Sequence, residues 1–232
     1  MPVAANILSI RERLTVAARR AGREPSEIAL MAVSKTQPAE RIREAYDAGQ
    51  RLFGENRVQD FAAKVGTLQD LRDAEWHMIG HLQTNKAART AELFRAVDSI
   101  DSLKLAEKLD AAARQLGRKL DVLIEINVGG EAAKSGVASD SPALEELLIA
   151  APRLEALAFR GLMTVPPFTA DSEGARPYFR KLRELRNQMA ARNLPAIALD
   201  QLSMGMSHDF EVAIAEGSTC VRVGTAIFGE RF

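Results

Sequence analysis

Lys35 is the residue of this sequence whose chemistry is most sharply defined by its surroundings. It follows an apolar run at residues 29–34, which has the length and composition of a buried β-strand. A lysine at the inner end of such a strand is partly desolvated, and desolvation favours the neutral amine that attacks aldehydes to form a Schiff base. A lysine that simply reaches water would occupy the same position. Position alone therefore leaves both interpretations open.

Two segments near the C-terminus have the composition of a phosphate site. They read SMGMSHD at residues 203–209 and VGTAIFGE at residues 223–230. Gly205 and Gly224 allow the backbone to approach an anion closely, and hydroxyl donors come from Ser203, Ser207 and Thr225. Ser207 is also predicted to cap a helix that begins near residue 208. Ordinary turns use the same residue types, so phosphate binding is one of two interpretations of these segments.

Arg222 is a charged residue inside an apolar run, Cys-Val-Arg-Val-Gly. A buried arginine needs an acceptor, which could be a carboxylate such as Glu125 or a bound ligand. Opposite a pyridine nitrogen, a permanently charged guanidinium would keep that nitrogen unprotonated and make the ring a weaker electron sink. Arg222 is therefore either structural support or a ligand contact.

Metal binding is not expected from the histidines of this chain. His77 and His81 are four residues apart, but they lie in a strand-to-loop context and lack an acidic third ligand in the pattern. His81, at the end of a strand, is instead a candidate ligand contact. Cys220 is the sole cysteine, which excludes an intrachain disulfide and indicates a core thiol in a reducing compartment.

The elements that must position these residues alternate between short β-like runs and longer helical patterns. Eight strands are predicted, at residues 29–34, 51–54, 76–79, 96–100, 122–128, 158–163, 198–203 and 220–224. Helices are predicted at residues 4–21, 38–49, 56–65, 84–93, 102–116, 141–150, 173–192 and 208–216. Helix signals include N-caps at Asp101 or Ser102 and at Ser141, and stops at Gly49, Gly117 and Gly217.

This alternation predicts an α/β fold with parallel strands covered on both faces. Eight strand–helix units favour a single (β/α)8 TIM barrel with an extra N-terminal helix, and an open doubly wound sheet is the structural alternative. Residues 1–232 are expected to form one domain, in which residues 166–177 are a surface loop. In such a barrel the functional groups project from the C-terminal ends of the strands, where the polar and glycine residues of this chain gather.

The composition excludes some classes of function. Thirty-one basic and 31 acidic residues give a net charge of zero, which argues against a general binder of nucleic acid or of anionic membranes. The N-terminal amphipathic pattern lacks the apolar core of a signal peptide, and no transmembrane-length apolar run is present. The sequence therefore predicts a cytoplasmic protein.

Several motifs resemble those of one protein family, the pyridoxal phosphate (PLP) homeostasis proteins. They read AVSKTQP, FGENRVQ, WHMIGHLQTNK, SIDS, INVGGEAAKSG, FRGLMT, LSMGMSHDFEVAIAEGST and VRVGTAIFGER, and they run in order from about residue 29 to the C-terminus. The resemblance implies a barrel like the N-terminal domain of alanine racemases, with PLP in its mouth. It also implies that residues 1–232 are a single PLP-binding domain.

By motif position, the resemblance implies a cofactor site made of Lys35, Asn56, His81, Met163, Ser203, Arg222, Gly224 and Thr225. Lys35 would form the Schiff base and Arg222 would face the pyridine nitrogen. The phosphate would be held by Ser203, Gly224 and Thr225, and the other three residues would line the pocket beside the ring. Lys134 is similar to a family lysine implicated in PLP handling.

The choice between enzyme and carrier depends on a second base. Alanine racemases use a tyrosine from a further domain, whereas this chain ends soon after its eighth strand, and Tyr46 and Tyr178 are predicted on helices outside the barrel. The expected function is therefore non-catalytic storage and delivery of PLP to PLP-dependent apoenzymes by a monomer, which also protects the cell from free PLP. The alternatives are a weak racemase-like PLP enzyme and an aldolase-type phosphosugar lyase that uses Lys35 without PLP.

Overall fold

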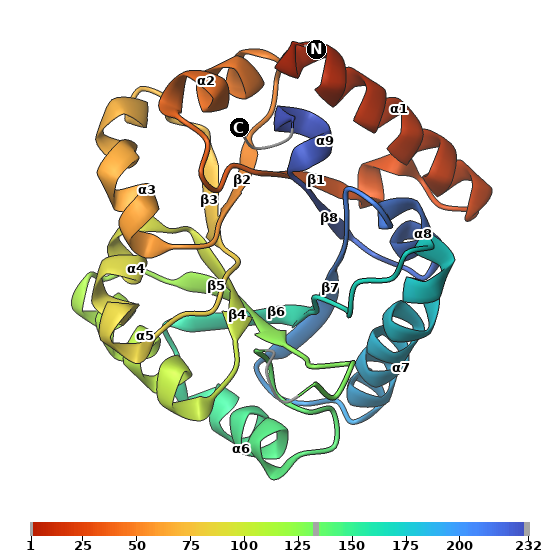
Figure 1. Cartoon of the computed structure of the whole chain (residues 1–232). Helices are drawn as coiled ribbons and strands as arrows, with labels where there is room; N and C mark the ends of the chain where they lie inside the picture. Colours follow the sequence, from red (N-terminus) through yellow and green to blue (C-terminus); the bar gives the residue numbers. More distant parts are fainter. Residues whose placement is uncertain (1, 132–134, 230–232) are drawn as a thin grey trace.

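Eight parallel strands form a closed barrel in the computed structural model, which describes residues 2–131 and 135–229. Each strand pairs with its neighbours in the order of the sequence, and β8 closes on β1 (Figure 1). The strands are β1 (Ala29–Val33), β2 (Leu52–Glu55), β3 (Glu75–Met78), β4 (Ala96–Ile100), β5 (Leu120–Glu125), β6 (Leu157–Met163), β7 (Ile197–Met206) and β8 (Cys220–Val223). The predicted barrel is confirmed, and the open sheet was the wrong alternative.

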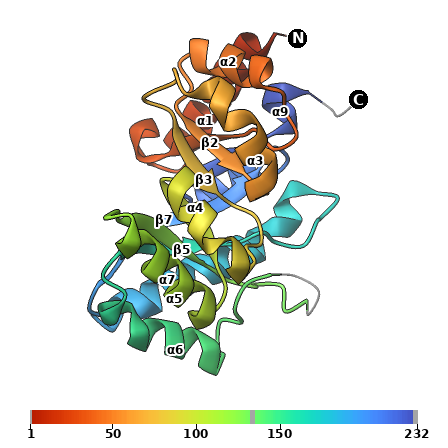
Figure 2. The same cartoon turned by 90° about the vertical axis from the view of Figure 1, so that its left-hand side faces the viewer.

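Helices surround the barrel and cover the outer face of its sheet (Figures 1 and 2). In the described residues they are α1 (Val3–Arg20), α2 (Ala39–Asp47), α3 (Val58–Lys64), α4 (Ala87–Leu93), α5 (Leu103–Gln115), α6 (Pro142–Ala150), α7 (Arg176–Ala191), α8 (Phe210–Ala215) and α9 (Thr225–Phe228). The extra N-terminal helix is α1, which packs against α2, α8 and α9. No helix within residues 2–131 and 135–229 is long and apolar enough to span a bilayer.

The local signals in the sequence fix most helix ends. Ser102 Oγ accepts from the backbone N–H of the third helical residue of α5, and Ser141 does the same for α6. Gly49 and Gly117 follow α2 and α5 with φ of +85° and +60°, a conformation that glycine adopts without a steric cost. The predicted cap at Ser207 was wrong, because α8 begins at Phe210 and Ser207 bonds to another loop.

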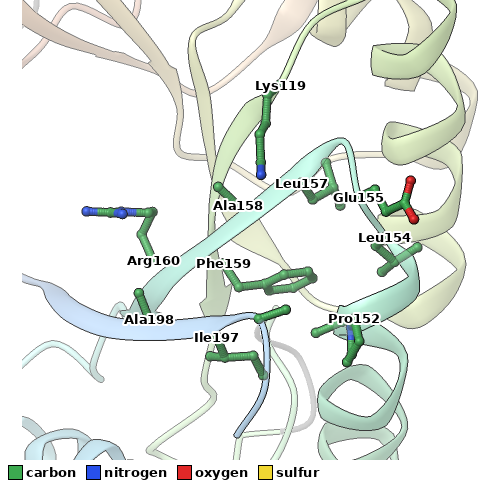
Figure 3. A pocket seen from close by; sticks show the side chains of 12 residues that line it. Lys119, Pro152, Leu154, Glu155, Leu157, Ala158, Phe159, Arg160, Ile197 and Ala198 are labelled. Carbon is green, nitrogen blue, oxygen red and sulfur yellow. The ribbon is translucent and has the colours of Figure 1, made fainter.

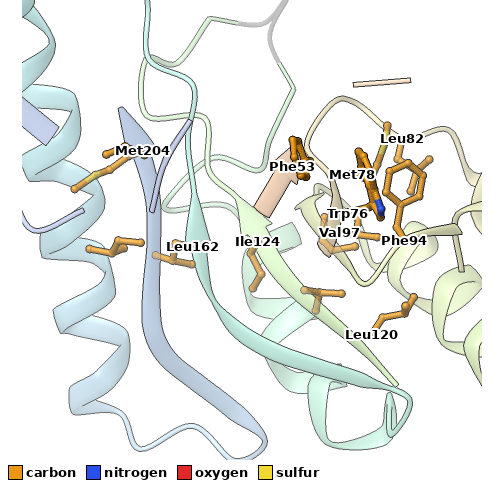
Figure 4. Packing of buried hydrophobic residues seen from close by; sticks show 14 of the residues in the cluster. Phe53, Trp76, Met78, Leu82, Phe94, Val97, Leu120, Ile124, Leu162 and Met204 are labelled. Carbon is orange, nitrogen blue, oxygen red and sulfur yellow. The ribbon is translucent and has the colours of Figure 1, made fainter. Parts of the chain in front are cut away.

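The core lies between the strands and the surrounding helices, and Figure 4 shows part of it. The Phe61 ring of α3 lies 4.7 Å from the ring of Trp76 and 4.9 Å from that of Phe94. Phe53 of β2 stacks on Trp76 at 4.8 Å. Through Phe61 these aromatic contacts join α3 to β3 and to the end of α4, and they help to fix the position of that helix.

The β6–β7 seam tolerates only glycine at one position. The pairing register shifts after Phe159, and Gly161 lies opposite Gln201. A Cβ atom at Gly161 would lie 1.9 Å from the Gln201 carbonyl oxygen. Any side chain there would force the two backbones apart, since the contact is with main-chain atoms.

We expect Gly161→Ala to lower the free energy of unfolding by about 3 kcal/mol through this overpacking. Urea unfolding followed by circular dichroism measures the change. Gly66→Ala is the matched control, because a Cβ at Gly66 meets nothing within 4 Å. A Gly161→Ala variant as stable as the wild type would contradict the close approach of the two strands.

Candidate functional site

Lys35 lies at the carboxyl end of β1, in the turn that leaves the barrel. Ser34 and Gln37 close this turn, since the Gln37 backbone N–H donates to the Ser34 carbonyl at 3.0 Å. Lys35 and Thr36 are its two central residues, and Thr36 has a φ of +63°. The Lys35 side chain is half-buried. The predicted position of this lysine at the mouth of the barrel is therefore confirmed.

A buried ion pair lies beneath the Lys35 turn. Glu55 is fully buried at the end of β2, and its Oε1 lies 2.8 Å from Lys64 Nζ and accepts from Ser34 Oγ at 2.5 Å. Burial raises the pKa of the Glu55 carboxyl, and the nearby Lys64 opposes that shift. Neither residue was predicted from the sequence to be part of the site. Glu55 had a signal, a carboxylate at the end of an apolar run, whereas Lys64 had none.

Buried polar atoms without a hydrogen-bond partner gather at the carboxyl ends of the strands. In the described part of the chain there are four such side-chain atoms, and three of them are Glu55 Oε2, Asn56 Oδ1 and Glu125 Oε2. Buried acceptors of this kind are rare in proteins and call for an explanation such as a ligand. Glu55 belongs to the buried ion pair with Lys64, whereas Asn56 Oδ1 and Glu125 Oε2, at the ends of β2 and β5, agree with a polar ligand in the barrel mouth.

Glu125 is a protonatable group on the opposite side of the mouth from Lys35. In a closed barrel of eight sequentially paired strands, β5 lies across from β1. Burial raises the pKa of the Glu125 carboxyl to about 7, with a further contribution from Asp101, and Arg222 and His81 oppose the shift. Glu125 is 7% exposed. The carboxyl therefore changes its charge close to neutral pH.

Arg222 is buried and is held by β7 and by the residue that follows β6. Its Nη1 donates to Ser203 Oγ at 2.6 Å, and its Nη2 donates to the Thr164 carbonyl at 2.7 Å. Arg222 makes no ion pair with Glu125 in the described part of the chain, so that pairing, one of two considered from the sequence, was wrong. Two neutral acceptors orient the guanidinium, and its charge lies near the mouth without a carboxylate contact.

The segments that follow β7 and β8 are joined by Ser207. Its Oγ accepts from the backbone N–H of Gly224 at 3.3 Å and of Ala226 at 3.4 Å. The predicted phosphate residues Gly224 and Thr225 therefore lie in one cluster with Ser207. Ser203 is fully buried and bonded to Arg222, so its hydroxyl lies deeper than this cluster.

The remaining predicted residues occupy different depths of the barrel. His81 is exposed after β3, and its Nδ1 lies 3.0 Å from Asp101 Oδ2. Met163 is fully buried at the end of β6. His77 contacts Asp98 instead and does not converge with His81. Among the residues that the structure describes, no group of three or more His, Cys, Asp or Glu side chains could hold a metal ion.

Two further groups lie away from the mouth or outside the structure. Tyr46 is on α2 and Tyr178 is on α7, both outside the barrel as predicted. Lys134 lies outside the described residues.

A groove of about 590 Å³ at the opposite end of the barrel is a separate feature (Figure 3). It is lined by Lys119 and by the residues where β6 and β7 begin, including Phe159 and Ile197. Since these are the amino ends of the strands, the groove is far from the polar residues of the mouth. In barrels of this type the active sites lie at the carboxyl ends of the strands, which is the opposite end from this groove.

Comparisons with known proteins agree with this geometry. The family model of the alanine racemase N-terminal domain matches residues 6–231. The pyridoxal phosphate homeostasis protein of Aquifex aeolicus is 48% identical over 222 residues, which are 96% of this chain and 95% of that protein. The pyridoxal phosphate homeostasis protein of Escherichia coli strain K12 is 45% identical over 231 residues, which are 99% of this chain and 97% of that protein.

A solved structure with a bound cofactor is also similar. The structure of PipY from Synechococcus elongatus with PLP bound matches this chain with a TM-score of 0.78 and 40% sequence identity. The match covers 95% of this chain and 100% of the PipY chain. The expected family and its barrel are therefore confirmed.

The stability of the unliganded protein should depend on the protonation of Glu125. The pKa of Glu125 in the folded protein, about 7, exceeds the ordinary value of 4.5. The contribution of Glu125 to the free energy of unfolding is therefore largest below pH 4.5 and is lost as the pH rises to 7. We expect Glu125→Gln to be more stable than the wild type at about pH 8, by up to about 3 kcal/mol, and to lose this advantage at about pH 4. Urea unfolding at each pH measures the difference.

Glu146→Gln, on the exposed surface of α6, is the matched control. A pH-independent difference between Glu125→Gln and the wild type would show that the carboxyl does not titrate near neutrality.

Proposed function

This chain belongs to the family of pyridoxal phosphate homeostasis proteins, and from that premise we propose that it binds PLP in the barrel mouth and takes part in intracellular PLP homeostasis. One observation carries the proposal. A Cβ atom at Gly224 would lie 3.5 Å from the Val33 carbonyl oxygen, two residues before Lys35. The proposed phosphate loop and the amine thus come from the paired strands β8 and β1. A small molecule with both an aldehyde and a phosphate suits this spacing.

The residues of the mouth fit PLP. The hydroxyl of Thr225 and the loop that Ser207 joins to Gly224 suit a phosphate. Asn56, with a buried and unpartnered Oδ1, suits a polar group of the ring. Arg222 would face the ring nitrogen, while His81 and Met163 would flank the ring.

Ser203 has a modified role in this proposal. Because its hydroxyl accepts from Arg222 and is fully buried, Ser203 supports the guanidinium more directly than it supports the phosphate. The hydroxyl of Ser207 takes the corresponding place beside Gly224.

The chemistry that PLP supplies is a reversible carbon–nitrogen bond. The neutral Nζ of Lys35 attacks the aldehyde carbon, a C=N bond forms, and the aldehyde oxygen leaves as water. The reverse reaction with water returns the free aldehyde. Such a bond keeps a reactive aldehyde out of solution and still permits its transfer to PLP-dependent apoenzymes.

A carrier fits the site better than an enzyme. Arg222 is permanently charged, so a ring nitrogen beside it stays unprotonated and the ring is a weak electron sink. The tyrosines at positions 46 and 178 lie outside the barrel and cannot serve as a second base. We further propose that residues 1–232 act as one PLP-binding domain, in a cytoplasmic monomer that does not bind nucleic acid or membranes.

One observation favours a weak racemase-like enzyme as a second candidate. Glu125 lies across the mouth from Lys35, and its carboxyl has a pKa of about 7, which suits proton transfer at neutral pH. Racemisation or transamination of an amino acid at enzyme-like rates by the purified protein would favour this candidate over the carrier.

The anchor itself is tested by Lys35→Ala. We expect this variant to lose the yellow imine absorption band and the PLP label that borohydride fixes to the protein. Lys35 is the one lysine among residues 34–37 of the β1 turn, and the neighbouring Lys64 amine is held by Glu55 and two carbonyl oxygens. Absorbance spectra and peptide mapping after reduction measure both. Lys119→Ala, at the opposite end of the barrel, should keep the band and the label. An unchanged band in Lys35→Ala would assign the aldehyde to another lysine, for which Lys134 is the candidate.

A further inference from the structure

Lys64 is a largely buried lysine to which the proposed PLP site assigns no role. Its Nζ lies 2.8 Å from Glu55 Oε1 and donates to the carbonyl oxygens of Ser34 at 3.0 Å and Gln37 at 3.2 Å. An ammonium has three N–H donors, and these three acceptors match them. We propose that Lys64 is a positioning residue that fixes the turn carrying Lys35 for Schiff-base formation, an inference that rests on the proposed function.

The turn needs such a clamp because its geometry is strained. Lys35 and Thr36 lie between Ser34 and Gln37, and the φ of +63° at Thr36 is unfavourable for a β-branched residue. Lys64 donates to the carbonyls at the first and last positions of the turn. Both ends are thereby fixed to one atom, and the strained centre cannot relax by moving either end.

Glu55 completes the clamp from below. It is fully buried, and its Oε1 accepts from Ser34 Oγ at 2.5 Å as well as pairing with Lys64. Buried ion pairs add little net stability, and their best attested use is to specify one arrangement. Ser34 is therefore held through its side chain by Glu55 and through its carbonyl by Lys64.

The other end of the clamp is anchored in the core. Lys64 is the last residue of α3, and Phe61 of the same helix is fully buried against Trp76 and Phe94. The ammonium thus extends from a fixed helix rather than from a surface loop. Its side chain is only 14% exposed.

The contacts of Lys64 should affect the condensation of Lys35 with the aldehyde and leave the binding of the phosphate unchanged. Condensation requires Lys35 Nζ to remain near the aldehyde carbon while loops on β7 and β8 hold the phosphate. If the turn moves, Lys35 Nζ spends less time at reacting distance from the aldehyde carbon, and formation of the C=N bond is slower. Phosphate binding involves other strands and does not depend on Lys64.

The experiment separates these two steps. Lys64→Met combined with Glu55→Gln removes the donors together with the buried countercharge, so that no unpaired carboxylate is left. Absorbance after mixing with PLP gives the condensation rate. Pyridoxine 5'-phosphate, which has an alcohol in place of the aldehyde, reports the non-covalent affinity.

We expect the condensation rate of the double variant to fall about tenfold or more, and the pyridoxine phosphate affinity to stay within about twofold of wild type. Lys181→Met is the matched control, since Lys181 Nζ also donates to a loop carbonyl, that of Val128 at 3.3 Å. This control should keep the wild-type rate.

If the double variant does not fold, Lys64→Arg supplies the test, because a planar guanidinium keeps the charge but cannot reproduce the three-point contact. Its condensation should also be slow. A wild-type rate in either folded variant, or an equal loss of pyridoxine phosphate affinity, would overturn the positioning role. Wild-type protein that forms no Schiff base with PLP would instead overturn the proposed function.

Discussion

The closure of eight parallel strands is the constraint on which the rest of this structure depends. Because every strand runs in the same direction, all carboxyl ends meet at one rim, and residues from distant parts of the sequence face one space. Closure also pairs β8 with β1, so the last loop of the barrel lies beside the first. Lys35 and Gly224 are 189 residues apart in sequence, yet each follows one of two neighbouring strands.

The rim combines cations held by specific partners with a carboxyl that titrates near neutral pH. Arg222 is oriented by two neutral acceptors, and Lys64 forms an ion pair with Glu55. Glu125, by contrast, has an unpartnered oxygen and changes its charge near neutral pH. Buried polar groups without partners are costly, and the ligand proposed for this rim would supply the contact that Glu125 lacks.

Reversible storage of a reactive aldehyde places particular demands on such a rim. The amine must be held where it can condense with the aldehyde, other residues must bind the phosphate, and the ring must not be activated as an electron sink. In the proposed function, Lys35 in the turn that Lys64 contacts, the segments that Ser207 joins and the guanidinium of Arg222 would meet these three demands. Glu125 is the feature of the site that an enzyme would use and a carrier would not need.

The sequence by itself determined the barrel, the extra helix, most helix ends and the position of Lys35, because hydrophobic periodicity, capping residues and glycines act over a few neighbouring residues. Tertiary structure alone decided the partners of the buried polar groups. It turned Ser207 from a predicted helix cap into a bridge between two loops, and it gave Arg222 neutral acceptors in place of Glu125. It also brought Lys64 to the Lys35 turn. These contacts join residues 17 to 58 positions apart, beyond the reach of local sequence patterns, and the packing of neighbouring elements sets their distances.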